Sequence, residues 1–235
     1  MVKRKNKITI RQLLTHSSGI DKDGNTPHWI NDDFPEIRKI KEIYNKEKSK
    51  IQEKLKEFRN LKEEDYIKEH IFCLLTPQSK AQSCWSAIEQ LFLENNFTEE
   101  NIKRILIKKT RFHNTKTIRI LYALENWSRV KENLSIKNKT ELRKWLSENV
   151  NGYGLKEAGH FLRNIGKSEN QIAILDRHIL KNLFELNKIP NIKIKSKKDY
   201  LEKEKSFIEF SKEIKIPIDE LDLLFWSKEN GEIFK

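Results

Sequence analysis

Hydrophobic residues recur at helical spacing in every long segment of the chain after residue 34. The first such segment, residues 35–58, puts its apolar side chains near one face: Ile37, Ile40, Tyr44, Ile51, Leu55 and Phe58. Only 7 Gly and 5 Pro interrupt the 235 residues. The pattern therefore predicts an all-α fold.

Breaks in the pattern divide the chain into ten expected helices. Helix starts are marked by Pro35 in a first turn and by Thr98 and Thr140 at N-caps. Pro77, in "TPQSK", ends the apolar second helix. The expected helices are 35–58, 63–75, 80–93, one starting after Thr98, 115–131, a short one from Thr140 to about Asn149, 155–165, 177–187, 197–213 and 218–228. Residues 1–34, with "SSGIDKDGNTPHW", have turn residues and no period, which predicts a loop or a poorly ordered arm.

Charge favours a polyanionic partner. The formal net charge is +12 and the pI about 9.5, as in many nucleic-acid-binding proteins. The positive charge has an alternative explanation in a compositionally biased genome, since Lys, Asn and Ile are abundant throughout. The mean hydropathy of −0.76 and the short apolar runs predict no membrane segment, and the basic N-terminus lacks the apolar stretch of a secretory signal. Two cysteines, Cys73 and Cys84, make no disulfide framework and no four-cysteine metal site, so a cytoplasmic protein is expected.

A turn with two glycines precedes the helix 155–165. Gly152 and Gly154 can adopt backbone angles that other residues avoid, and a turn that feeds a helix N-terminus can cradle a phosphate. Lys156 stands in the first turn of that helix, where the helix dipole disfavours a cation. Either this lysine is merely solvated or it has a chemical task. An ordinary helical hairpin remains the alternative for the glycines.

Asp176 follows Lys156 by twenty residues, after the apolar run "IAIL". It is an evident N-cap for the helix 177–187. A carboxylate placed there can also point into a cleft and stabilise positive charge beside a nucleophilic amine, which must be neutral to attack. Both interpretations stay open on spacing alone.

Four stretches together resemble a known family. "NGYGLKEAGHFLRNIG" and "AILDRHIL" are similar to the helix–hairpin–helix–Gly/Asp DNA glycosylase superfamily, in its bifunctional branch. "FCLLTPQSKAQSCW" and "DLLFWSKENGEIFK" resemble, more narrowly, the archaeal and bacterial second class of 8-oxoguanine DNA glycosylase/lyase. The resemblance covers about residues 36–235 and leaves 1–35 as an N-terminal extension. It implies two helical subdomains, about 80–150 and 36–79 plus 151–235, that flank a DNA-binding cleft.

The resemblance also implies the chemistry. Lys156 is the expected nucleophile at C1′ of the damaged nucleotide, forming a Schiff base before the strand is nicked by β-elimination. Asp176 is expected to favour the oxocarbenium-like transition state. No divalent metal or organic cofactor is implied, although the hairpin carbonyls could hold a monovalent cation. The implied partner is double-stranded DNA with an oxidised purine, bound by a monomer at the nucleoid.

Further residues receive expected roles in binding DNA. Asp222, Trp226 and Lys235 match the class pattern for the base pocket, and His160, one turn after Lys156, faces the same cleft. Gln78 and Ser79 are expected around the orphaned cytosine, and Phe112, followed by His113, as a wedge in the duplex. Phe112 and Trp226 could instead be core residues, and "TPQSK" a plain turn. Three cations are candidate phosphate contacts or a solvated basic face: Lys116, Arg119 and Arg163.

Two other functions remain in view. A relative of endonuclease III type usually carries a four-cysteine cluster after the catalytic Asp, and no cysteine follows Cys84. A non-enzymatic helix–hairpin–helix module needs the glycines but not Asp176 at its spacing. A borohydride-trapped covalent adduct separates an enzyme from such a module.

Overall fold

The computed structural model of the protein describes residues 35–230 and 233–235. The extension predicted for residues 1–35 lies, apart from Pro35, outside the described residues. The chain divides into two compact units after Ile40, and the helical body is the second of them, Lys41–Lys235. The predicted subdomains, about 80–150 and 36–79 plus 151–235, stay a prediction.

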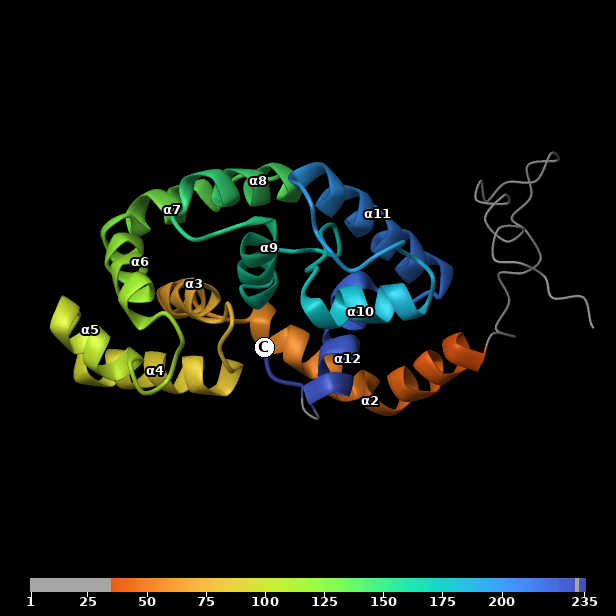
Figure 1. The fold of residues 1–235 in the computed structure, drawn as a ribbon, viewed down its shortest axis with the longest axis horizontal. Coiled ribbons are helices and arrows are strands. Elements are labelled where there is room, and N and C mark those ends of the chain that lie inside the picture. The colour runs from red at the N-terminus through yellow and green to blue at the C-terminus, as the bar shows by residue number, and fades with distance from the viewer. Residues whose placement is uncertain (1–34, 231–232) are drawn as a thin grey trace, which may run out of the picture. The chain divides into compact units, whose positions relative to one another are not determined.

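Helices account for all the regular structure in the described residues, which confirms the all-α prediction (Figure 1). They are α2 (Pro35–Arg59), the short 3₁₀ turn η2 (Glu63–Asp65), α3 (Tyr66–Leu75), α4 (Ala81–Glu94), α5 (Glu99–Leu106), α6 (His113–Glu125), α7 (Trp127–Asn133), α8 (Lys139–Asn149), α9 (Leu155–Asn164), α10 (Arg177–Glu185), α11 (Lys197–Glu213) and α12 (Ile218–Asn230). Across residues 35–230 and 233–235, no helix is long and apolar enough to cross a membrane.

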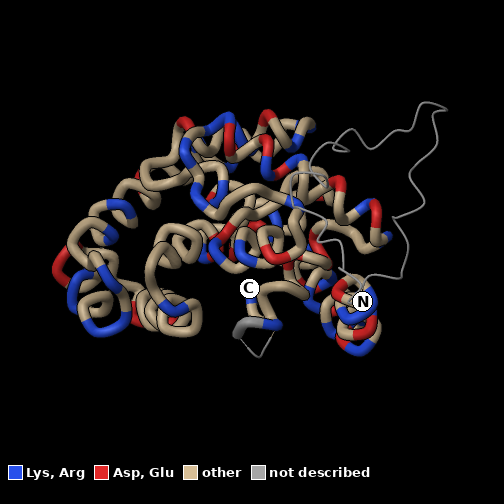
Figure 2. The backbone as a smooth tube through the Cα atoms, turned by 45° about the vertical axis from the view of Figure 1, so that its right-hand side comes forward, with Lys and Arg blue, Asp and Glu red and all other residues tan. Residues whose placement is uncertain are grey.

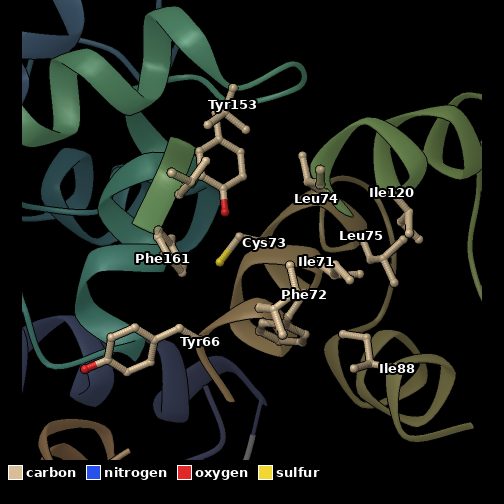
Figure 3. Close-up of a cluster of buried hydrophobic side chains, with 14 of the residues drawn as sticks. Tyr66, Ile71, Phe72, Cys73, Leu74, Leu75, Ile88, Ile120, Tyr153 and Phe161 are labelled. Atoms are coloured by element: carbon tan, nitrogen blue, oxygen red, sulfur yellow. The ribbon is translucent and has the colours of Figure 1, made fainter. Parts of the chain in front are cut away.

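Helix α3 is the centre of the core. Its sequence has no polar face, and every residue except Lys68 is buried. It packs against α4, α6 and α9. Figure 3 shows Phe72 of α3 between Phe161 of α9 on one side and Ile88 of α4 on the other. The helix that carries Lys156 is thereby held against the middle of the molecule.

The remaining helices continue from α9. Helix α8 packs on α9 across the hairpin, and α12 packs on α10 and α11. In Figure 1, α3 to α7 lie at one end of this unit, α10 to α12 at the other, and α8 and α9 between them. Lys and Arg occur along most of these helices with Asp and Glu among them (Figure 2).

Local capping confirms two predicted helix starts and corrects a third. The Thr98 hydroxyl accepts the Asn101 N–H at 3.4 Å, and Asp176 caps α10 as expected. The start predicted at Thr140 is wrong, because the Asn138 side chain accepts the Glu141 N–H at 3.0 Å and α8 begins at Lys139. Asn is at least as good a cap as Thr, and it comes first along the chain.

The single helix predicted over 115–131 is also wrong. Helix α6 begins at His113, and the chain breaks at Asn126 before α7 starts. The Asn126 side chain donates to the Tyr122 carbonyl at 2.9 Å, and its backbone leaves the helical region (φ −97°, ψ 9°). A side-chain amide that bonds the nearby main chain competes with the helix, which hydrophobic periodicity does not register.

Gly166, after α9, is required by its surroundings. Its φ is +68°, and a Cβ there would stand 2.5 Å from the Arg59 Cα. At Gly159, inside α9, a Cβ would meet its nearest atom, the Ala173 oxygen, at an ordinary 3.6 Å. These two glycines therefore differ sharply in their tolerance of alanine.

We expect Gly166→Ala to lower the free energy of unfolding by more than about 1 kcal/mol, because the substitution combines a positive φ with a backbone clash. Gly159→Ala is the matched control and should be neutral or stabilising by up to about 1 kcal/mol, since alanine is the better helix former. Urea unfolding of both variants measures the difference. Equal stability of the two would contradict the close approach of Gly166 and Arg59.

Candidate active site

The glycine hairpin joins α8 to α9 and touches α6. Gly152 has a φ of +97°, and a Cβ on it would lie 2.7 Å from Cδ of Arg119. Tyr153 is buried beside it, and its hydroxyl donates to the His70 carbonyl at 3.0 Å. The positive φ strains any other residue at position 152, and Tyr153 fixes the hairpin to α3.

Lys156 stands in the first turn of α9, as predicted, and its side chain is only 24% exposed. Its Nζ lies 3.6 Å from Oε1 of Glu157, whose Oε2 accepts the Gly154 N–H at 3.2 Å. Lys156 is therefore not simply solvated. A phosphate bound at Gly154 must displace the Glu157 carboxylate.

Asp176 ends a buried extended segment. Its Oδ1 accepts the N–H groups of His178 and Ile179, both at 2.8 Å, so the N-cap role is confirmed. Two side chains of α11 provide hydrogen-bond partners for the extended backbone before it. Tyr200 accepts the Leu175 N–H at 3.2 Å, and Glu204 accepts the Ala173 N–H at 2.8 Å. The position of Asp176 is thus set by α11, which sequence spacing does not reveal.

Asp222 is a carboxylate whose pKa the fold changes strongly. It is buried and accepts a hydrogen bond from Nη1 of Arg163 at 2.7 Å. Burial raises its pKa to about 7, against the opposing effect of Arg163. The negative charge of Asp176 raises that pKa further and the positive charge of Lys156 lowers it. Lys156 and Asp176 are therefore both close enough to Asp222 to act on its carboxyl group.

His160 lies one turn after Lys156, buried against the Phe72 ring with a centroid separation of 5.6 Å. Burial lowers its pKa well below the usual value, and the cations Arg163, Lys156 and Lys235 lower it further. The Lys235 main chain acts in the opposite direction, but among the described residues neither ring nitrogen has a hydrogen-bond partner of good geometry. His160 is a neutral imidazole with free polar edges.

The C-terminal lysine is docked. Lys235 forms an ion pair with Glu69 of α3, and its Nζ stands 3.5 Å from the centre of the Trp85 ring. Glu69 is buried and also accepts the Asn164 amide at 2.9 Å. Trp226, one turn after Asp222 on α12, is partly exposed. Nothing in the sequence pattern marked Glu69 or Trp85 as partners of the chain end.

The residues predicted to contact the duplex form a second group, in two loops before α4 and α6. Gln78 and Phe112 are exposed, and both have a φ of +56°. Ser79 is half-buried and accepts the Arg111 N–H at 3.0 Å, while His113 begins α6. Such backbone conformations are uncommon for these residue types and cluster at functional sites.

Lys116 and Arg163 are neither phosphate contacts nor part of a solvated basic face. Arg163 is buried in its pair with Asp222, and Lys116 is buried with its ammonium bonded to the Leu75 carbonyl at 2.6 Å. Neither can reach a surface phosphate. Both side chains lie on inward-facing sides of their helices. The basic residues beside them in the sequence give no sign of this burial.

Within residues 35–230 and 233–235, no group of three or more His, Cys, Asp and Glu side chains is placed to hold a metal ion. The absence of a cofactor stays a prediction, as does a monovalent cation on the hairpin carbonyls. An amine lies beside a carboxylate at Lys156 and Glu157, and such an amine can act as a nucleophile when a neighbouring base takes its proton.

Comparison with known proteins gives a consistent result. The family model described as 8-oxoguanine DNA glycosylase matches residues 36–216. A protein of Fusobacterium nucleatum named 8-oxoguanine DNA glycosylase/AP lyase is 41% identical over 220 residues, which cover 87% of this chain and 99% of that protein. The protein of the same name in Methanocaldococcus jannaschii is 34% identical over 210 residues, covering 85% and 99%.

Solved structures agree with these matches. The Methanocaldococcus jannaschii 8-oxoguanine glycosylase/lyase, in complex with a 15mer DNA containing 8-oxoguanine, matches with a TM-score of 0.77 at 32% identity, over 85% of this chain and 99% of that one. The 8-oxoguanine DNA glycosylase of Thermotoga maritima matches with a TM-score of 0.77 at 26% identity, over 85% and 98%. This chain therefore has the helix–hairpin–helix glycosylase fold predicted from the sequence.

Asp222 generates a prediction about pH. Its pKa is higher in the folded than in the unfolded chain, so the folded state holds more protons between about pH 4 and 7, and stability falls as pH rises through that range. Asp222→Asn keeps an oxygen for Arg163 and removes this proton. We expect the free energy of unfolding of the wild type to fall from pH 5 to pH 8 by about 1–2 kcal/mol more than that of the variant. Urea unfolding at both pH values measures it, with Asp65→Asn as a surface control that should follow the wild type.

Proposed function

Because the chain belongs to the 8-oxoguanine DNA glycosylase family, we propose that it is a bifunctional glycosylase/AP lyase that excises 8-oxoguanine from duplex DNA and nicks the strand. The observation that carries the proposal is the position of Lys156: its side chain is only 24% exposed, and its Nζ lies 3.6 Å from Oε1 of Glu157. Schiff-base chemistry requires a lysine amine that is partly shielded from solvent and can give its proton to a neighbouring base.

Lys156 is the proposed nucleophile. Its neutral amine attacks C1′ as the bond from C1′ to the base breaks, and the base leaves with a proton. The sugar ring then opens to a protonated imine between Nζ and C1′. Loss of the C2′ proton breaks the C3′–O bond and nicks the strand, and water finally hydrolyses the imine. The substrate nucleotide must leave the base stack before the amine can reach C1′.

Asp176 has a proposed electrostatic role. As the base leaves, positive charge develops on the sugar, and a fixed carboxylate stabilises that charge in the transition state. The two N–H groups that bind Asp176 Oδ1 hold the carboxylate in place. Glu157, next to Lys156, forms an ion pair with the lysine ammonium before the reaction.

The base pocket is proposed on α9, α12 and the chain end. Trp226 offers a ring on which a flipped purine can stack, and Asp222 lies one turn before it. His160 offers a neutral imidazole with free nitrogens, and Lys235 brings a cation to the same region. These polar groups could distinguish 8-oxoguanine from guanine by the hydrogen bonds of the oxidised edge.

The duplex is proposed to lie across the two strained loops and the hairpin. Phe112 is the wedge, with His113 beside it, and Gln78 and Ser79 meet the opposite base. The hairpin glycines Gly152 and Gly154 approach a phosphate, with a monovalent cation on the hairpin carbonyls as the further proposal. The net charge of +12 favours such a partner. We further propose a monomer acting in the cytoplasm at the nucleoid.

Two alternative functions can each be tested specifically. A glycosylase for a different oxidised base would use the same lysine on another duplex. A non-enzymatic hairpin module would bind DNA and form no covalent adduct.

The first experiment mixes the protein with a duplex containing 8-oxoguanine opposite cytosine and adds borohydride. We expect a trapped adduct with the wild type and at least a thousandfold less with Lys156→Ala, because the nucleophile is removed. Lys205→Ala, an exposed lysine of α11, is the matched control and should trap like the wild type.

Wild-type protein that binds this duplex but yields no adduct would overturn the lyase proposal and leave a monofunctional enzyme or a binding module. An adduct on a duplex with oxidised pyrimidine, but none with 8-oxoguanine, would favour the related glycosylase.

Phe112 generates a prediction in which binding and stability move in opposite directions. Glycine accepts a φ of +56° without strain, so Phe112→Gly should be at least as stable as the wild type in urea unfolding. Loss of a stacked ring should weaken binding to an abasic-site duplex about tenfold. Ile118→Gly would break the helix, so Ile118→Ala, an exposed apolar change in α6, serves as the control with unchanged affinity. A Phe112→Gly variant that binds normally would contradict the wedge.

A further inference from the structure

Lys116 is buried in the first turns of α6, and its ammonium has three acceptors. Nζ donates to the Leu75 carbonyl at 2.6 Å, the Pro77 carbonyl at 2.9 Å and the Ser79 hydroxyl at 2.8 Å. All three acceptors belong to the end of α3 and the loop that follows it. A buried cation is costly unless every proton is bonded, and this one has as many acceptors as ammonium protons.

The same contacts join the two loops that carry Gln78 and Phe112. Ser79 Oγ accepts Nζ of Lys116 and also the Arg111 N–H at 3.0 Å. One oxygen thus links the loop after α3 to the residue that precedes Phe112. Gln78 and Phe112, on either side of this link, are exposed and have the same left-handed backbone conformation.

A strained, exposed loop needs external support to keep one conformation. The left-handed conformation costs roughly 1–2 kcal/mol per residue, and neither Gln78 nor Phe112 is buried enough to recover that cost by packing. The bonds from Lys116 tie the 76–80 loop to α6, and the Ser79 hydroxyl, which accepts one of them, also accepts the Arg111 N–H of the second loop. A plain interhelical turn would not require a buried lysine.

We propose that Lys116 is a positioning residue for DNA recognition: its ammonium holds the 76–80 loop and the 110–113 loop together, so that Gln78 and Phe112 enter the duplex as one rigid unit. The inference rests on the proposed function of these loops in binding DNA. It assigns Lys116 no contact with substrate.

The support depends on protonation. Burial lowers the pKa of Lys116 to about 8, the Cys84 thiol of α4 raises it, and Arg119 of α6 lowers it. Above that pH, the neutral amine has two protons for three acceptors, and its lone pair faces an oxygen. The end of α3 presents main-chain carbonyls, so no other titrating group replaces the lost bond on that side.

The free energy of unfolding changes in the opposite direction to this loop support as the pH rises. Because the pKa is lower in the folded chain, the unfolded state binds more protons between about pH 8 and 10, and the contribution of Lys116 to stability rises with pH there. A loss of DNA selectivity above pH 8 therefore cannot come from unfolding through this group.

The test measures Kd at pH 7 and pH 9 for two duplexes, one undamaged and one with a tetrahydrofuran abasic analogue opposite cytosine. Selectivity is the ratio of the two Kd values. For Lys116→Met at pH 7 we expect selectivity to fall about tenfold. The borohydride-trapping rate, measured at saturating concentrations of a duplex with a natural abasic site, which has the C1′ aldehyde that the tetrahydrofuran analogue lacks, should change far less. The wild type should lose selectivity from pH 7 to pH 9, and the variant should show no further loss. Lys108→Met, an exposed lysine in the same region, removes an equal charge and should weaken both duplexes alike.

Unchanged selectivity in Lys116→Met, whether or not its trapping rate falls, would overturn the proposal. If Lys116→Met does not fold, Ser79→Ala removes the shared oxygen without opening the core, and normal selectivity in that variant overturns it equally. Trapping by the wild type on 8-oxoguanine DNA tests the proposed function separately. A wild type that binds the abasic duplex selectively but never forms an adduct fails that test and leaves the loop proposal standing.

Discussion

The buried ion pair between Arg143 of α8 and Glu204 of α11 is the constraint on which the active-site geometry depends. Both side chains are almost completely buried, and the pair is bidentate. Glu204 also binds the Ala173 N–H, so one carboxylate joins α8, α11 and the extended segment before Asp176. Removing one partner of such a pair typically costs about 3–5 kcal/mol, because the other charge is left buried and unpaired. Here the same loss would also release the backbone that places Asp176.

Charged side chains are concentrated around the buried helix α9. Lys156 and Arg163 lie on this helix, Asp222 faces it from α12, and Asp176 acts on Asp222 from the start of α10. Burial raises the pKa of Asp222, and the charges of Arg163, Asp176 and Lys156 act on that carboxyl as well. A catalytic amine gains from this arrangement because the surrounding dipoles and charges are fixed before the substrate arrives. Burying these charges is unfavourable at Asp222, because burial disfavours the ionised form of that carboxyl.

Much of this could be predicted from the sequence. Helical periodicity predicts the all-α fold, and local spacing places Lys156 in the first turn of α9 and Asp176 at the N-cap of α10. The catalytic roles of these two residues stay a proposal. The break at Asn126 and the start of α8 were missed, since they depend on side-chain bonds to the main chain that a hydrophobic pattern does not contain. Arg163 was taken for a phosphate contact, because only tertiary packing shows that its helix face is buried against α12. Contacts across the fold, such as that of Glu69 with the chain end, have no local signature in the sequence.

Helix α6 connects the parts that are proposed to meet DNA. Phe112 precedes its first turn, Lys116 follows one turn later, and Arg119 lies against Gly152 of the hairpin. Residues spaced by four and three lie along one face of a helix, so a single rod spans from the wedge loop to the hairpin, about 10 Å along its axis. The absence of a Cβ at Gly152 leaves room for the Arg119 side chain of α6 against the hairpin. The separation of the proposed wedge from the proposed phosphate-binding turn is therefore a property of one packed helix, and the loops need only be held at its end.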